Sequence, residues 1–149
     1  MQPLLCLKKV TKSFHQGSQR IEVLNKLELT LEKGEIVSIL GQSGSGKSTL
    51  LSLLAGLDHP DLGTIEVNGE NLANLSQDEL SKFRSENLGI VFQRYHLMSN
   101  LTALENVGLP LELQGKKEFL EPARKALNYV GLSNRVSHFP SQLSGGECQ

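Results

Sequence analysis

The chain has 149 residues, of which 38% are hydrophobic and 21% are charged, and its formal net charge is −1. These values are typical of one folded domain with its own core, and they exclude a nucleic-acid partner held by bulk electrostatics. Cys6 and Cys148 stand near opposite ends of the sequence, so this pair provides neither a metal-binding spacing nor a disulfide framework. No apolar run approaches the ~20 residues of a membrane span, so we expect any membrane role to come through a partner.

The predicted elements alternate between strands and helices along the first part of the chain. Strands are expected where short runs are apolar or alternate with polar residues: 23–31, 35–40, 64–67 and 88–92. Of these, 35–40 and 88–92 resemble buried parallel strands. Helices are expected where capping boxes, helical periodicity or a terminal glycine mark them: 47–55, a short helix from 76, 102 to about 113, and about 117–130. This order predicts an α/β fold whose residues from about 94 to 143 form a helical insertion.

Residues 41–48 carry a pattern that binds phosphate. They match G-x-x-x-x-G-K-[ST] at every fixed position, after a predicted strand and before a predicted helix, which is the context of a P-loop. Small residues let the backbone wrap around a phosphate, while successive N–H groups and the helix N-terminus attract its charge. The alternative is a glycine-rich turn without a ligand, which the agreement of pattern and context disfavours. The candidate ATP-binding residues are Gly41, Gln42, Ser43, Gly44, Ser45, Gly46, Lys47, Ser48 and Thr49.

Three side chains of this loop have separate expected roles. The ammonium of Lys47 can reach the β and γ phosphates as a point charge, which makes Lys47 a candidate catalytic residue. The hydroxyl of Ser48 is placed to ligate Mg²⁺, and Thr49 can contact the α phosphate.

Three further motifs narrow the choice among the families that carry a P-loop. Residues 143–147, Leu-Ser-Gly-Gly-Glu, closely resemble the LSGGQ signature of ABC (ATP-binding cassette) ATPases, with Glu147 in place of the usual glutamine. Residues 91–93 resemble the Q-loop of that family, and residues 10–14 resemble its A-loop. Together with the P-loop, these motifs resemble the ATP-binding subunits of ABC transporters. The stretch 93–111 looks most like the subgroup that serves lipoprotein release and macrolide export.

The resemblance implies a P-loop NTPase fold of the ABC ATPase type, with an antiparallel β subdomain and a helical subdomain. Residues 1–93 would form the β subdomain and the P-loop core, and residues from about 94 to 143 the helical subdomain. Residues 143–149 would hold the signature motif.

The resemblance also implies roles for residues outside the P-loop. Phe14 would stack on adenine, because a flat aromatic face is what a base needs; a phenylalanine of the core or of a strand edge is the less favoured alternative. Gln93 would contact Mg²⁺ or the attacking water, and would thus be catalytic together with Lys47; a solvated glutamine at a strand end is the alternative. Four residues would contact the nucleotide of a second subunit: Ser144, Gly145, Gly146 and Glu147.

The implied function is that of an ATPase subunit that converts ATP and water to ADP and phosphate with Mg²⁺. Its partners would be a second ATPase subunit, in a head-to-tail homodimer, and transmembrane permease subunits. It would lie in the cytoplasm, peripheral on the inner face of the plasma membrane, and drive export or release of a lipoprotein, peptide or macrolide. A soluble ABC protein of repair or translation is an alternative, but such proteins usually carry two cassettes or long insertions.

The chain also departs from the family pattern at its C-terminal end. The Walker B strand and the switch histidine of the family would follow Gln149. We therefore expect the core sheet to lack its C-terminal part and residues 36–40 to expose an apolar edge. The 149 residues alone would then bind ATP without hydrolysing it, or be an inactive relic.

Overall fold

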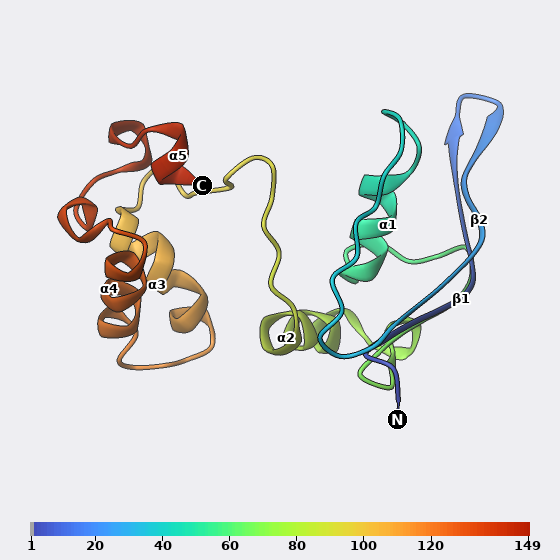
Figure 1. The fold of residues 1–149 in the computed structure, drawn as a ribbon, viewed down its shortest axis with the longest axis horizontal. Helices are drawn as coiled ribbons and strands as arrows, with labels where there is room; N and C mark the ends of the chain where they lie inside the picture. Colours follow the sequence, from blue (N-terminus) through green and yellow to red (C-terminus); the bar gives the residue numbers. More distant parts are fainter. Residues whose placement is uncertain (1) are drawn as a thin grey trace. The chain divides into compact units, whose positions relative to one another are not determined.

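The computed structural model describes residues 2–149, which fall into two compact units, one on each side of the boundary between Leu88 and Gly89 (Figure 1). The first unit contains a β-sheet and two α-helices. The second contains three α-helices and two short 3₁₀ turns.

The sheet of the first unit has four antiparallel strands in the order β2-β1-β3-β4. Strands β1 (Leu5–Gln16) and β2 (Gln19–Leu31) form a long hairpin. Strand β3 (Leu62–Val67) pairs with the other edge of β1, and the short β4 (Glu70–Asn71) turns back beside β3. The register places Leu7 of β1 opposite a leucine of β2 and an isoleucine of β3.

Two helices complete the core of this unit. Helix α1 (Lys47–Leu54) ends at Ala55, followed by Gly56 at a φ of +61°. Helix α2 (Gln77–Asn87) begins with the predicted capping box, and the 3₁₀ turn η1 (Leu72–Asn74) precedes it. The helices and the sheet share one apolar cluster: Leu5, Leu7, Val10, Leu24, Leu50, Leu53, Ile65, Val67, Leu72, Leu80 and Phe83.

The prediction of parallel strands at residues 35–40 and 88–92 is wrong. Neither segment pairs with a strand anywhere in residues 2–149, so their backbone groups belong to no ladder. Ile36 is 97% exposed and Val91 is 83% exposed, while Ile39 is partly buried against the core. An apolar sequence favours a strand, but a strand also needs a hydrogen-bonded neighbour. Apolar side chains are exposed at 36–40, but this segment forms no strand in residues 2–149, so the unpaired sheet edge expected there is not formed.

Strand β1 extends well beyond the short motif expected at residues 10–14. Its alternation is hidden because the strand carries bulges: the register shifts between Leu7 and Val10, and Lys9 has a φ of +51°. A bulge moves the following side chains to the other face and disrupts the period of two.

The second unit is helical. Helix α3 (Ala103–Leu113) starts at the predicted capping box, and α4 (Leu120–Tyr129) starts a few residues after the predicted position. The 3₁₀ turns η2 (Ser133–Arg135) and η3 (Pro140–Gln142) lead to the one-turn α5 (Gly145–Cys148). Among the residues that the model describes, no helix is both long and apolar enough to cross a bilayer.

Candidate nucleotide-binding site

The P-loop depends on a glycine at the start of α1. Gly46 is buried and has a φ of +88°, which L side chains rarely adopt. A Cβ atom at this position would lie 2.7 Å from Val23 Cγ1 and 3.1 Å from the Val23 carbonyl oxygen. The first N–H groups of a helix have no partner within the helix. In α1 no side chain caps them either, so they can bind an anion.

Lys47 lies in the first turn of α1, and its side chain is folded back over the loop. Its Nζ donates hydrogen bonds to the carbonyl oxygens of Gly41, at 2.8 Å, and Gln42, at 2.6 Å. The ammonium is therefore held beside the loop backbone, where a phosphate would sit in the nest of N–H groups.

A cavity of about 510 Å³ brings the P-loop together with an aromatic ring from β1. Phe14 is 43% exposed, so part of its ring surface is free. The cavity thus combines an apolar aromatic surface with a cation and backbone donors, which suits a nucleotide base and its phosphates. The lining residues are Phe14, Val23, Ser43, Gly44, Gly46, Lys47, Ser48 and Thr49.

The exposed Ser48 hydroxyl in this cavity is an oxygen donor of the kind that Mg²⁺ prefers. Mg²⁺ keeps several waters and needs few protein ligands beside substrate phosphates, so Ser48 fits the expected site. Gln93, the other expected Mg²⁺ contact, belongs to the second unit. Its role stays a prediction.

The second unit contains a larger cavity, of about 630 Å³, which suits phosphate less well. Its lining is mainly apolar, with side chains such as Val91, Phe92 and Leu127. Within residues 2–149, no lysine or arginine side chain lines this cavity, so a phosphate there would lack a cationic partner.

The predicted signature residues form a tight turn in the second unit. Ser144 caps α5: its Oγ accepts from the Glu147 N–H at 3.3 Å, and its N–H donates to Glu147 Oε2 at 2.8 Å. Arg135 Nε donates to Glu147 Oε1 at 2.9 Å. Arg135 belongs to none of the motifs found in the sequence. The capping box could have been found from the Ser-x-x-Glu spacing, but nothing in the sequence indicates the ion pair.

Residues 24–149 match the family model described as ABC transporter. The chain belongs to the ABC transporter family. The lipoprotein-releasing system ATP-binding protein LolD of Alcanivorax borkumensis is 48% identical, over 99% of this chain and 65% of the relative. The macrolide export ATP-binding/permease protein MacB of Burkholderia pseudomallei is 47% identical, over 99% of this chain and 23% of the relative. The chain therefore spans somewhat less than two thirds of LolD and about a quarter of MacB. The identities confirm the predicted resemblance to the lipoprotein-release and macrolide-export subgroup.

A solved structure supports the fold. The dimeric ATP-binding cassette MJ0796, in a post-hydrolysis state bound to ADP and Pi, matches with a TM-score of 0.88 and 39% identity. The match covers 97% of this chain and 65% of that chain. The predicted fold class, a partial ABC ATPase cassette, is confirmed.

The turn at residues 144–147, the predicted signature, carries a carboxylate whose titration can be measured. The hydrogen bond from Arg135, followed by those from Ser144, lowers the pKa of Glu147 from 4.5 to about 2. A group with a depressed folded-state pKa stabilises the fold above its unfolded pKa and loses that contribution as pH falls through the folded value. We therefore expect the Glu147 capping contacts to weaken between pH 4.5 and about 2.

Carbon-detected NMR of the Glu147 carboxyl should give a midpoint near 2, and Arg135→Gln should raise it toward 4.5. A midpoint that the substitution leaves unchanged would contradict the ion pair as the main cause.

Proposed function

We propose that this chain binds Mg-ATP in the cavity of its first unit, as the nucleotide-binding part of an ABC transporter ATPase. The observation that carries the proposal is that Phe14 and the P-loop, far apart in the sequence, line one cavity. In this proposal Phe14 stacks on adenine, and the loop N–H groups hold the phosphates. Lys47 neutralises the β and γ phosphates, Ser48 ligates Mg²⁺ and Thr49 contacts the α phosphate.

The same proposal assigns the remaining predicted residues to an assembled ATPase. Gln93 contacts Mg²⁺ or the attacking water, and the signature residues of one chain contact the nucleotide held by a second, head-to-tail copy. The dimer named for MJ0796 supports this arrangement. The predicted division into residues 1–93, about 94–143 and 143–149 belongs to this proposal as well. The signature residues are Ser144, Gly145, Gly146 and Glu147.

We further propose that the protein hydrolyses ATP to drive lipoprotein release or macrolide export. The names of its relatives LolD and MacB support this assignment. Its proposed location is the cytoplasm, peripheral on the inner membrane face, with transmembrane permease subunits as partners.

Calorimetric titration of Mg-ATP into the 149-residue chain tests the binding step. We expect one ATP per chain, because the cavity lies within one unit. Ser144→Ala is the matched control: in the proposal Ser144 acts on the nucleotide of a second copy, so at concentrations where the chain is monomeric its substitution should leave the affinity unchanged. Absence of binding by a chain whose circular dichroism shows it to be folded would contradict the proposal.

A further inference from the structure

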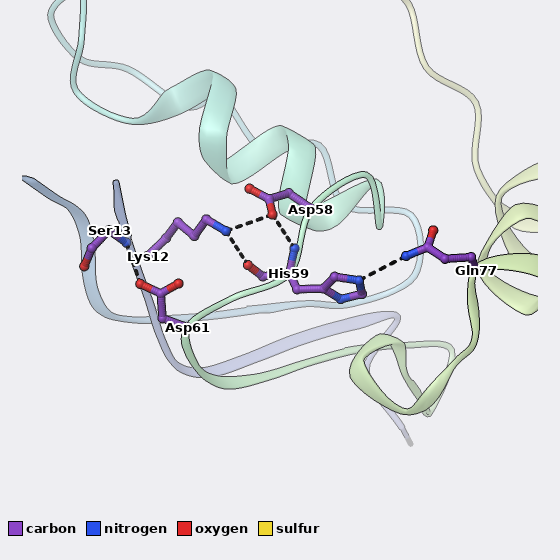
Figure 2. A network of polar contacts seen from close by, with 6 residues as sticks. All are labelled: Lys12, Ser13, Asp58, His59, Asp61 and Gln77. Carbon is purple, nitrogen blue, oxygen red and sulfur yellow. Dashed lines mark hydrogen bonds and ion pairs between the residues drawn. The ribbon is translucent and has the colours of Figure 1, made fainter. Parts of the chain in front are cut away.

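The side chain of Lys12 is almost buried and is tied to the loop that follows α1. Its side chain is 11% exposed, and its Nζ donates to Asp58 Oδ1 at 2.8 Å and to the His59 carbonyl oxygen at 2.7 Å (Figure 2). Asp58 Oδ1 also accepts from the His59 N–H at 2.7 Å. A nearly buried ammonium is costly unless it is paired, and these contacts supply both the opposite charge and the hydrogen bonds that offset the cost.

The same loop holds the backbone of β1 beside Lys12. Asp61 Oδ2 accepts from the Ser13 N–H at 2.8 Å (Figure 2). The Asp61 N–H donates to the Thr11 carbonyl oxygen at 2.8 Å. Hydrogen bonds therefore fix residues 11–13 on both sides of Lys12, directly before Phe14.

The fixed ammonium faces the ring of Phe14. Lys12 Nζ lies 5.4 Å from the ring centroid, within the range of a cation–π attraction. Two N–H groups of the ammonium are directed to Asp58 and His59, so its position does not depend on the ring. The Phe14 ring, by contrast, is partly exposed and lines the cavity.

We propose that Lys12 is a positioning residue for the adenine end of the nucleotide: its tethered ammonium holds the Phe14 ring in the orientation that stacks on the base. This inference rests on the proposed function, because it requires a base at Phe14. The inference goes beyond the proposed function by assigning a role to Lys12, which lies outside the cavity lining. The loop after α1 thereby supports the adenine end of the site.

The test compares two ligands in the full chain, Mg-ATP and Mg-tripolyphosphate, because the second has no base. Lys12→Met removes the charge and keeps an unbranched apolar side chain. It should weaken ATP binding by about fivefold, the effect of losing a cation–π contact with a partly exposed ring, and leave tripolyphosphate binding unchanged. Lys12→Arg keeps the cation, so the ratio of its affinities for Mg-ATP and Mg-tripolyphosphate should stay close to the wild-type ratio.

A double substitution tests whether Lys12 affects ATP binding through the Phe14 ring. In a Phe14→Ala background, Lys12→Met should cause no further loss of ATP affinity. Equal losses for both ligands, an unchanged ratio, or a loss that persists without the ring would overturn the inference. If Lys12→Met does not fold, Asp58→Asn loosens the tether while keeping the ammonium. Asp58→Asn should also lower the ratio of the affinity for Mg-ATP to the affinity for Mg-tripolyphosphate. An unchanged ratio would again overturn the inference.

The failure of the proposed function gives a different result. A wild-type chain that binds neither ligand contradicts the nucleotide site itself. A wild-type chain that binds both with equal affinity removes the base from the site and with it the role of Lys12.

Discussion

Replacing Lys47 with alanine should weaken Mg-ATP binding about a hundredfold. Lys47 Nζ is held beside the loop carbonyls of Gly41 and Gln42, and Lys47 lines the cavity together with other residues of the P-loop. Hydrogen bonds to charged groups contribute roughly 1.5–3 kcal/mol each. With the lower value for each bond, losing two of them to phosphates removes about 3 kcal/mol, or two factors of ten in the dissociation constant. Calorimetric titration measures the change directly.

A matched control separates this contact from a general loss of positive charge. Lys33 is an exposed lysine in the same unit and lies outside the cavity lining. Lys33→Ala should leave the dissociation constant for Mg-ATP within about twofold of the wild-type value, since charges exposed to solvent are screened by salt. Equal effects of the two substitutions would show that Lys47 has no specific contact with the phosphates.

Replacing Gly63 with alanine should cost the first unit more than 3 kcal/mol of its free energy of unfolding, as estimated from backbone strain and steric overlap. Gly63 is in β3 with a φ of +90°, against the bulged part of β1. A Cβ atom there would lie 2.5 Å from the Lys8 carbonyl oxygen and closer still to that of Lys9. Both contacts are with backbone, which cannot move aside without breaking the pairing of β1 and β3.

Gly34 provides a close control because it has the same φ of +90° and a Cβ atom there would have no neighbour within 4 Å. Gly34→Ala should therefore cost only the backbone strain, about 1–2 kcal/mol. Urea denaturation followed by circular dichroism gives both free energies of unfolding. If the two substitutions cost the same, the close approach of β3 to the bulge of β1 does not contribute to stability.

Much of the local structure could be predicted because it depends on neighbours in the sequence. The capping boxes at Ser76 and Thr102 require only side chains three residues apart, and both are formed. The P-loop likewise follows from a short pattern whose glycines permit one backbone path. The resemblance to a family then placed Phe14 at the adenine position, and the structure brings its ring to the same cavity.

The remaining features could not be predicted because they depend on residues distant in the sequence. Whether residues 36–40 form a strand is decided by a neighbouring strand, and apolar character alone cannot supply one. The bulges of β1 hide its alternation, so most of its length was missed. The pairs Lys12–Asp58 and Arg135–Glu147 join segments whose approach is set by the fold, and no spacing in the sequence indicates either pair.

The most direct test of the nucleotide site is an NMR titration of the isotope-labelled chain with Mg-ATP, read at the backbone amides and at the Phe14 ring. We predict that the largest shifts occur at residues 41–49 and at Phe14, because Phe14 and most residues of this loop line the proposed nucleotide cavity. Shifts confined to the apolar cavity of the second unit, or no shifts at saturating Mg-ATP, would contradict the assignment of the nucleotide site to the first unit.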